Sequence, residues 1–330
     1  MTEKKKICFV ASDASGVGYY RSFLPCKYLK SEFDTSITVG FDPNKLYYYY
    51  EHNIVILQRH YHPDLLKFVD VMHEKGKQVW YDIDDLLWDI PNANSAKKAW
   101  TKNMLKDAQN LISVCDVVTV STKPLYDYIK RFNKNVYIMP NMVEDNFIKK
   151  EKNDKVRILY FGSNTHSGDF SSAVKYGLDE IVKQDNVELI FMGYIPDEYK
   201  TVAKYVEYVD IKNYISTLQS INPDICIMPL DNNHFNCCKS NLKYLESTLA
   251  GAVSIASNIY PYSKTIEHNY NGLLCSKGQE WKKALIELVN DKNYREHMYD
   301  IASTHVQIYF TWDSGKREKV TEQYKQMISM

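Results

Sequence analysis

Short apolar runs rich in β-branched residues alternate along the chain with segments whose apolar residues recur every three or four positions. Runs of the first kind are typical of buried strands, and the second pattern is typical of amphipathic helices. The runs predict strands at 7–11, 35–41, 53–58, from 78 onward, 117–121, 136–139, 156–162, 187–193, 206–210, 225–230 and 252–257. The periodic segments predict helices at 20–31, 63–76, 95–114, 123–132, 170–184, 211–221, 240–251, 278–291, 294–310 and 312–330.

Strands that alternate with helices predict the α/β class, with parallel, doubly wound sheets. A chain of 330 residues suits two domains better than one. The charged stretch 149–155 separates two such series and is the expected linker. We therefore expect one Rossmann-like domain at 1–150, a second at 151–310, and a C-terminal helix at 311–330.

The most informative helix follows the strand at 225–230 and a polar loop at 231–236. Ser240 or Asn241 is its expected N-cap, and Gly251 its stop. Beside an apolar stripe, the same period carries Lys239, Lys243 and Glu246. Lysines near a helix N-terminus suit a phosphate or diphosphate, and a glutamate further along suits ribose hydroxyls. A plain solvated face is the alternative interpretation.

Two glycine-bearing loops follow first strands of the predicted domains. Gly16 and Gly18 precede a helix with Arg21 near its start, and Gly162 opens a loop that contains His166. Such loops bring backbone N–H groups close to a ligand. The full G-x-G-x-x-G fingerprint is missing, which argues against an NAD site. Arg21 suits an anionic group or is a surface arginine, and His166 is a ligand contact or a plain loop residue.

Three aspartates, Asp82, Asp84 and Asp85, follow the strand that begins at 78. At the carboxyl edge of a sheet they can cap the next helix, hold Mg²⁺ or Mn²⁺, or orient and deprotonate an acceptor hydroxyl. Carboxylates so close together repel one another, so at least one pKa should be raised unless a cation lies nearby. Arg59, at the end of the preceding strand, is the expected partner.

Composition narrows the function classes. The net charge of +0 gives no reason to expect nucleic acid or an anionic membrane as a partner. The 7 cysteines are scattered without a C-x-x-C pair, so a zinc site is unsupported and a reducing compartment is expected. A signal core and an apolar run long enough for a membrane span are missing from the sequence, which predicts a cytoplasmic protein with at most peripheral membrane contact.

The run from Lys239 to Leu274, "KSNLKYLESTLAGAVSIASNIYPYSKTIEHNYNGLL", resembles the donor-binding segment of GT-B glycosyltransferases, in particular family 4 (group 1). Its glutamate-bearing helix ends in Ala-Gly and is followed by a strand and "NGLL". Glu246 matches the second glutamate of the family's paired-glutamate motif, and this second glutamate binds the donor ribose. The first glutamate would stand at Cys238, and this departure is similar to a subgroup with "KSNLK.LE". The "YDIDD" at 81–85, the "PN" at 140–141 and the loop at 162–169 resemble the same group.

The resemblance implies a GT-B fold, in which the last helix crosses back to the first domain. It implies transfer of a sugar from a UDP- or GDP-sugar to an acceptor hydroxyl with retention and without a required metal or other cofactor. The acceptor stays open among a glycan, a lipid-linked glycan, protein and a modified DNA base. Alternatives are a metal-dependent nucleotide-sugar enzyme that uses Asp82, Asp84 and Asp85, and a non-catalytic nucleotide-sugar-binding protein. The expected catalytic residues are Asp82 and Asp84; the expected donor-binding residues are Gly16, Gly18, Arg21, Gly162, His166, Lys239, Ser240, Asn241, Lys243, Glu246 and Tyr262.

Overall fold

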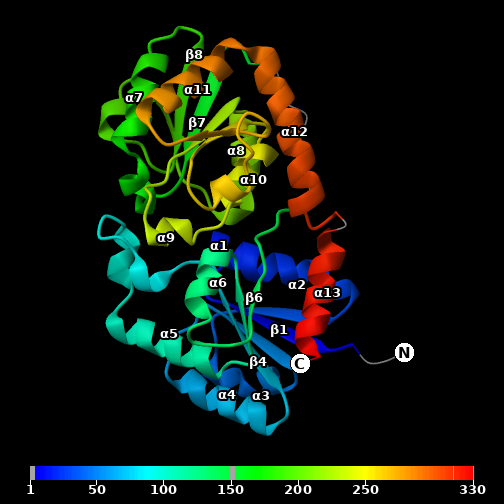
Figure 1. The fold of residues 1–330 in the computed structure, drawn as a ribbon. Helices are drawn as coiled ribbons and strands as arrows, with labels where there is room; N and C mark the ends of the chain where they lie inside the picture. Colours follow the sequence, from blue (N-terminus) through cyan, green and yellow to red (C-terminus); the bar gives the residue numbers. More distant parts are fainter. Residues whose placement is uncertain (1–3, 149–152, 315, 330) are drawn as a thin grey trace.

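The computed structural model describes residues 4–148, 153–314 and 316–329. Within these ranges the chain forms two parallel six-stranded sheets, stacked one above the other in Figure 1. The expected α/β class is therefore confirmed. The expected linker at 149–155 and the boundary at 150 fall largely on 149–152, which lie outside the described residues.

The strand order of the first sheet is β2-β1-β3-β4-β5-β6. Its strands are β1 (Lys6–Ala11), β2 (Asp34–Val39), β3 (Ile54–Gln58), β4 (Gln78–Ile83), β5 (Val117–Val120) and β6 (Val136–Ile138). The order reverses between β1 and β3. Open α/β sheets bind ligands at the carboxyl ends of the strands beside such a reversal.

The strand order of the second sheet is β12-β11-β10-β7-β8-β9. Its strands are β7 (Val156–Phe161), β8 (Val187–Met192), β9 (Lys204–Val206), β10 (Ile225–Met228), β11 (Val253–Ser257) and β12 (Leu273–Cys275). The reversal lies between β7 and β10, as in dinucleotide-binding sheets.

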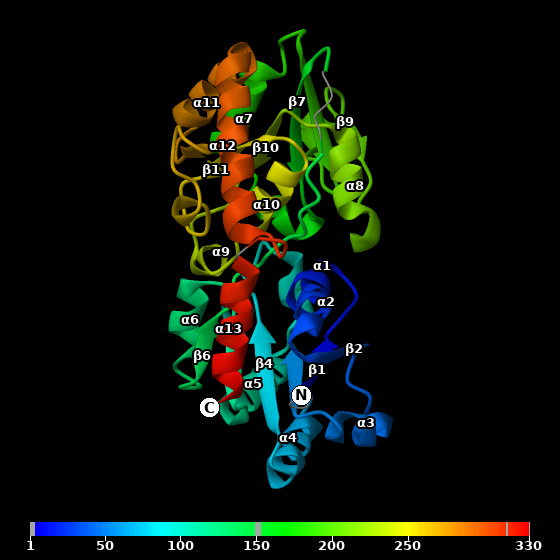
Figure 2. The same ribbon diagram turned by 90° about the vertical axis from the view of Figure 1, so that its right-hand side faces the viewer.

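Helices surround both sheets (Figures 1 and 2). The α-helices are α1 (Gly16–Gly18), α2 (Leu24–Tyr28), α3 (Leu46–Tyr50), α4 (Asp64–Glu74), α5 (Lys102–Val114), α6 (Lys123–Ile129), α7 (Ser172–Ile181), α8 (Ile211–Ile221), α9 (His234–Cys237), α10 (Leu242–Leu249), α11 (Gly278–Asn290), α12 (Lys292–Phe310) and α13 (Lys316–Ile328). The 3-10 helices are η2 (Leu29–Ser31), η3 (Pro43–Lys45), η4 (Leu87–Asp89), η5 (Ser95–Ala99), η6 (Asn164–Asp169), η7 (Asp197–Tyr199) and η8 (Tyr262–Lys264).

Three differences from the predicted elements have local causes. The helix expected at 95–114 is divided, because Thr101 is extended and caps α5 with its side chain. The strand expected at 206–210 is β9, three residues long and ending at Val206. The second half of the predicted polar loop at 231–236 belongs to α9, which ends at Cys237 and is capped by the Asn233 side chain. The elements α3 and β12 had not been predicted.

The first turns after β1 do not form one regular helix. Between α1 and α2 lies a π-helical turn, η1 (Tyr19–Phe23), and Pro25 stands in the first turn of α2. Proline has no N–H group to donate and disturbs the preceding turn of a helix. Pro25 thus follows directly on a change of helical pitch. Single π-turns of this kind are frequent at functional sites.

The C-terminal helices connect the two sheets. In both views α12 runs along the second sheet and α13 lies against the first (Figures 1 and 2). Trp80 of β4 stacks on Tyr324 of α13 with ring centroids 5.8 Å apart. At the crossing, Trp312 stacks on Tyr28 of α2 at 5.5 Å. Among the described residues, none of these helices combines the length and apolarity that a membrane span requires.

Candidate active site

A cavity of about 250 Å³ lies where the carboxyl ends of the two sheets face each other. Both strand-order reversals contribute to it, through the loops after β1, β7 and β10. The residues that line it are Gly16, Val17, Tyr20, Asp84, Asp85, Asn141, Gly162, Ser163, Tyr208, Ile211, Tyr214, Leu230, Lys239, Ser240, Leu242, Lys243, Glu246 and Tyr262. A larger hollow around Asn153 and Arg295 contains none of the predicted site residues.

Helix α10 supplies the two buried charges of the second domain. Glu246 is 5% exposed, and its Oε1 accepts a hydrogen bond of 2.9 Å from the Tyr20 hydroxyl. Burial raises the pKa of Glu246 to about 7. One turn earlier, Lys243 lies under the rings of Tyr160 and Phe161, and its Nζ has no hydrogen-bond partner among the described residues. Burial lowers the pKa of Lys243 to about 8.

The residues just before α10 face the first domain. Lys239 Nζ lies 4.0 Å from Asp85 Oδ1 and over the ring of Phe235. The Ser240 hydroxyl accepts a 2.9 Å hydrogen bond from the Asn141 amide. Asn241 is the N-cap residue, as predicted in position, but its side-chain amide donates to Thr265 Oγ1. Cation and helix N-terminus therefore meet at one end of the cavity, where an anion is favoured.

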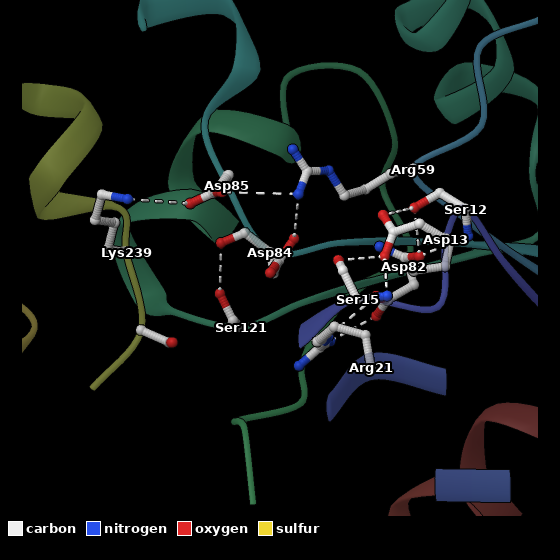
Figure 3. Close-up of polar contacts among 12 residues, drawn as sticks. Ser12, Asp13, Ser15, Arg21, Arg59, Asp82, Asp84, Asp85, Ser121 and Lys239 are labelled. Atoms are coloured by element: carbon white, nitrogen blue, oxygen red, sulfur yellow. Dashed lines mark hydrogen bonds and ion pairs between the residues drawn. The ribbon is translucent and has the colours of Figure 1, made fainter. Parts of the chain in front are cut away.

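The predicted residues Arg21 and Asp82 bind each other (Figure 3). Arg21 Nε and Nη2 donate to the two Asp82 oxygens at 3.0 and 2.5 Å, and Thr119 Oγ1 donates to Oδ2 at 2.6 Å. Arg21 Nη1 also donates to Met139 O and Asn141 Oδ1. Both side chains are buried, and neither is among the described residues that line the cavity. The expected donor role of Arg21 and catalytic role of Asp82 stay predictions, and in this structure the two side chains are engaged with each other.

Asp84 and Asp85 do line the cavity, and Arg59 lies beside them (Figure 3). Arg59 Nη1 is 3.6 Å from Asp84 Oδ1 and 3.8 Å from Asp85 Oδ2, which are ion-pair distances rather than hydrogen bonds. Burial raises the pKa of Asp84 to about 6. Arg59 itself has a left-handed backbone, with φ of 57°. Such strain in a non-glycine residue is frequent at functional sites.

The glycine loops differ in role. Gly16 and Gly162 line the cavity, whereas a side chain at Gly18 would meet the carbonyl oxygen of Asp13 at 2.0 Å. The tight turn alone therefore requires glycine at position 18, and the expected donor contact of Gly18 stays a prediction. The backbone of His166 lies in η6, but its side chain lies outside the described part of the chain. Tyr262 is 2% exposed and closes the cavity floor.

Cys238, at the position of the missing glutamate, is buried where the domains meet. It packs with Phe235 among core residues of the first domain, and its carbonyl oxygen accepts a hydrogen bond from Thr122 Oγ1 at 2.7 Å. An ionised side chain at this buried position would lose its hydration. The departure from the two-glutamate pattern is therefore part of the domain interface.

Sequence reasoning missed Tyr20, Asn141 as a side-chain contact, Tyr208 and Tyr214. Tyr20 was available from its position directly before Arg21 in a glycine-bearing loop. Tyr208 and Tyr214 are surrounded by ordinary apolar spacing, and no local signal marks them. Only the approach of α8 to α10 brings them to the cavity.

Comparisons with known proteins agree on the fold. Residues 143–305 match the family model described as "Glycosyl transferases group 1". Sucrose-phosphate synthase from Thermosynechococcus elongatus aligns with a TM-score of 0.68 at 13% identity, covering 99% of this chain and 98% of that one. Anabaena HepE in complex with UDP and glucose aligns at 0.67 and 11% identity, covering 98% and 99%. A glycosyltransferase from Rickettsia africae aligns at 0.66 and 15%, also covering 98% and 99%. No curated protein matches the sequence.

These likenesses to solved structures confirm the predicted GT-B fold, and the family match at residues 143–305 includes α10 and the second sheet. The subgroup with "KSNLK.LE" stays a prediction. Together, the comparisons show that residues 143–305 are similar to the glycosyltransferase group 1 family and that the two facing Rossmann-like domains have the GT-B fold.

Proposed function

We propose that the protein is a glycosyltransferase that moves a sugar from a UDP- or GDP-sugar to an acceptor hydroxyl. The observation that carries this proposal is the face that α10 presents to the interdomain cavity, with Lys243 and Glu246 buried inside a group 1 domain. The second domain would bind the donor and the first domain the acceptor. A structural neighbour, HepE, was solved with UDP and glucose, which favours UDP as the first donor base to test.

Lys239 and Lys243 are suited to stabilise the leaving nucleoside diphosphate. The bond from the anomeric carbon to the diphosphate oxygen breaks, and negative charge develops on that oxygen. A buried ammonium group without a hydrogen-bond partner, together with helix N–H groups, stabilises such charge strongly because no solvent must reorganise. Gly162 and Gly16 allow the chain to approach the phosphates closely.

Asp84 is the carboxylate that we assign to the acceptor hydroxyl. It lines the cavity, and its pKa near 6 lets it accept a proton or a hydrogen bond at neutral pH. In the retaining reaction implied by the resemblance, a donor phosphate oxygen helps to accept the acceptor proton, and Asp84 orients the hydroxyl and shares that proton as it leaves. Asp82 would act only through Arg21, as a positioning residue.

We further propose that the reaction needs no metal. Asp82 is fully engaged by Arg21 and Thr119, while Asp84 and Asp85 face the cations Arg59 and Lys239. These cations already occupy the positions in which a divalent ion would neutralise the carboxylates. The acceptor classes named above stay open. The seven cysteines, all within the described residues, form no disulfide, which supports the proposal of a reducing, cytoplasmic setting.

A thermal-shift screen against UDP-, GDP-, ADP- and CMP-sugars tests the proposal, since a bound donor stabilises the folded state by mass action. We expect one base to raise the melting temperature in wild type and less so in Lys243→Met. Donor turnover is then followed by nucleoside diphosphate release, with and without EDTA. Binding without turnover for any acceptor would favour the non-catalytic alternative, and loss of activity in EDTA would favour the metal-dependent one.

A further inference from the structure

Tyr20 is the side chain through which the first domain closes on the buried carboxylate of the second. It comes from η1, and its hydroxyl donates to Glu246 Oε1 at 2.9 Å. Both side chains are buried, with 4% and 5% exposure. Figures 1 and 2 both show α1, directly before η1, at the boundary of the two domains beneath α10.

The backbone at Tyr20 is anchored to the first domain through its neighbour Arg21. The next residue, Arg21, is tied to Asp82, Met139 and Asn141 by four hydrogen bonds. Neighbouring residues in a helical turn point in different directions, so the turn that anchors Arg21 in the first sheet aims Tyr20 at the second domain. The turn begins with a backbone hydrogen bond of 2.9 Å from Tyr19 N to Ser15 O, and at position 18 it has no room for a side chain.

The contact conflicts with the role proposed for Glu246. A ribose presents its hydroxyl groups as hydrogen-bond donors to such a carboxylate. In this structure one carboxylate oxygen already accepts from Tyr20, inside a cavity of about 250 Å³. A carboxylate oxygen can accept a second hydrogen bond, but in so small a space a ribose hydroxyl that approaches Oε1 must compete with the tyrosine hydroxyl for room.

We propose that Tyr20 is a positioning residue that latches the donor site shut: its hydroxyl bonds to Glu246 in place of a ribose hydroxyl and is released when a nucleoside diphosphate binds. This inference rests on the proposed function. The latch lowers the apparent affinity for donor by the fraction of molecules in which it is closed. It also links the two sides of the cleft, since the group that moves away from Glu246 belongs to the same turn as Arg21.

Calorimetric titration with UDP, GDP and ADP tests the latch. We expect Tyr20→Phe to bind the preferred nucleoside diphosphate about tenfold more tightly than wild type, which is the size of a modest hydrogen bond to a charged group. Tyr19→Phe is the matched control, because it also loses a hydroxyl bonded to a carboxylate, that of Glu144, but away from Glu246. We expect its affinity to equal that of wild type.

A double-mutant cycle separates the latch from a general loosening of the domains. In the Glu246→Ala background, Tyr20→Phe should change affinity less than twofold. Unchanged or weaker binding by Tyr20→Phe in the wild-type background would overturn the latch. If wild type binds none of the three nucleoside diphosphates, the proposed function itself fails, so the two failures are distinguishable.

Discussion

The two sides of the cleft bury charged side chains in opposite ways. On the first-domain side, Arg21 and Asp82 satisfy each other with two hydrogen bonds, and further partners complete them. On the second-domain side, Lys243 has no hydrogen-bond partner in the described structure, and Glu246 has one tyrosine hydroxyl.

The difference in pairing has a physical meaning. A buried ion pair whose hydrogen bonds are all made has a structural role, because removing one member leaves an uncompensated buried charge. A buried charge without a partner costs free energy in the empty protein and is expected where a ligand supplies the partner. Asp84 lies between the two cases, since Arg59 approaches it only to 3.6 Å.

The largest expected effect is on catalysis and concerns Asp84, whose pairing is intermediate between the two sides of the cleft. Asp84→Asn keeps the side-chain shape but cannot accept a proton. We expect transfer to fall by about 10²–10⁴-fold, as for a lost acid–base group, with nucleoside diphosphate affinity unchanged. Single-turnover transfer and calorimetry measure the two quantities. Loss of donor affinity that Mn²⁺ restores would instead identify the aspartates as metal ligands.

Removing one member of the buried Arg21–Asp82 pair should destabilise the folded protein. Arg21→Met leaves the Asp82 carboxylate buried without its cation, and we expect the free energy of unfolding to fall by about 3–5 kcal/mol. Urea denaturation followed by circular dichroism measures it. Lys123→Met is the control, because its ion pair with Asp127 is exposed and should contribute less than about 1 kcal/mol. Equal decreases in the free energy of unfolding for the two variants would show that the buried Arg21–Asp82 pair contributes no more to stability than the exposed Lys123–Asp127 pair.

Removing the buried Lys243 ammonium group should have the opposite effect and stabilise the folded protein when no ligand is bound. Lys243→Met removes a buried ammonium group and keeps an apolar side chain of similar length. We expect a higher melting temperature without ligand, together with weaker nucleoside diphosphate binding, on the order of 1.5–3 kcal/mol for contacts to a charged group. Thermal unfolding with and without the nucleotide compares the two. A less stable empty protein would mean that Lys243 has a structural partner.

The smallest expected effect is a dependence of donor affinity on pH. Glu246 accepts ribose hydroxyls best when ionised, so affinity should rise as pH passes its pKa of about 7. Lys243 binds diphosphate as a cation, so affinity should fall again above about 8. The two groups are neighbours, and the limbs therefore belong to the pair. Calorimetry from pH 6 to 9 should show a narrow maximum of a fewfold.

Glu246→Ala should weaken binding by about 1.5–3 kcal/mol and remove the acidic limb only. The same raised pKa has a consequence for the empty protein. The folded carboxyl keeps its proton to a higher pH than the unfolded one, so this group's contribution to stability is lost as pH rises from about 4.5 to about 7. A pH profile of affinity that is flat across this range would contradict the assignment of Glu246 to the ribose.

Local sequence determined most of the elements and one side of the site. The β-branched run of β10, the stop at Gly251 and the spacing of Lys243 and Glu246 place both charges on one face of α10, because helical geometry fixes neighbours three and four residues apart. The same reasoning placed Asp84 at the end of β4, where parallel strands open toward ligands.

Tertiary structure decided which charged side chains are paired with other side chains of the protein and which are not. Arg21 and Asp82 are 61 residues apart, and Tyr20 and Glu246 are 226 apart. Neither spacing nor composition tells that the first pair is closed off by Thr119 or that Cys238 is buried in the interface. Pairing over such distances depends on strand order, on the turn at η1 and on the approach of the two domains. These properties belong to the packed molecule, because packing sets how far each charge is desolvated and which partners it has. Burial and pairing together decide whether a buried charge has a structural role or is available to bind a ligand.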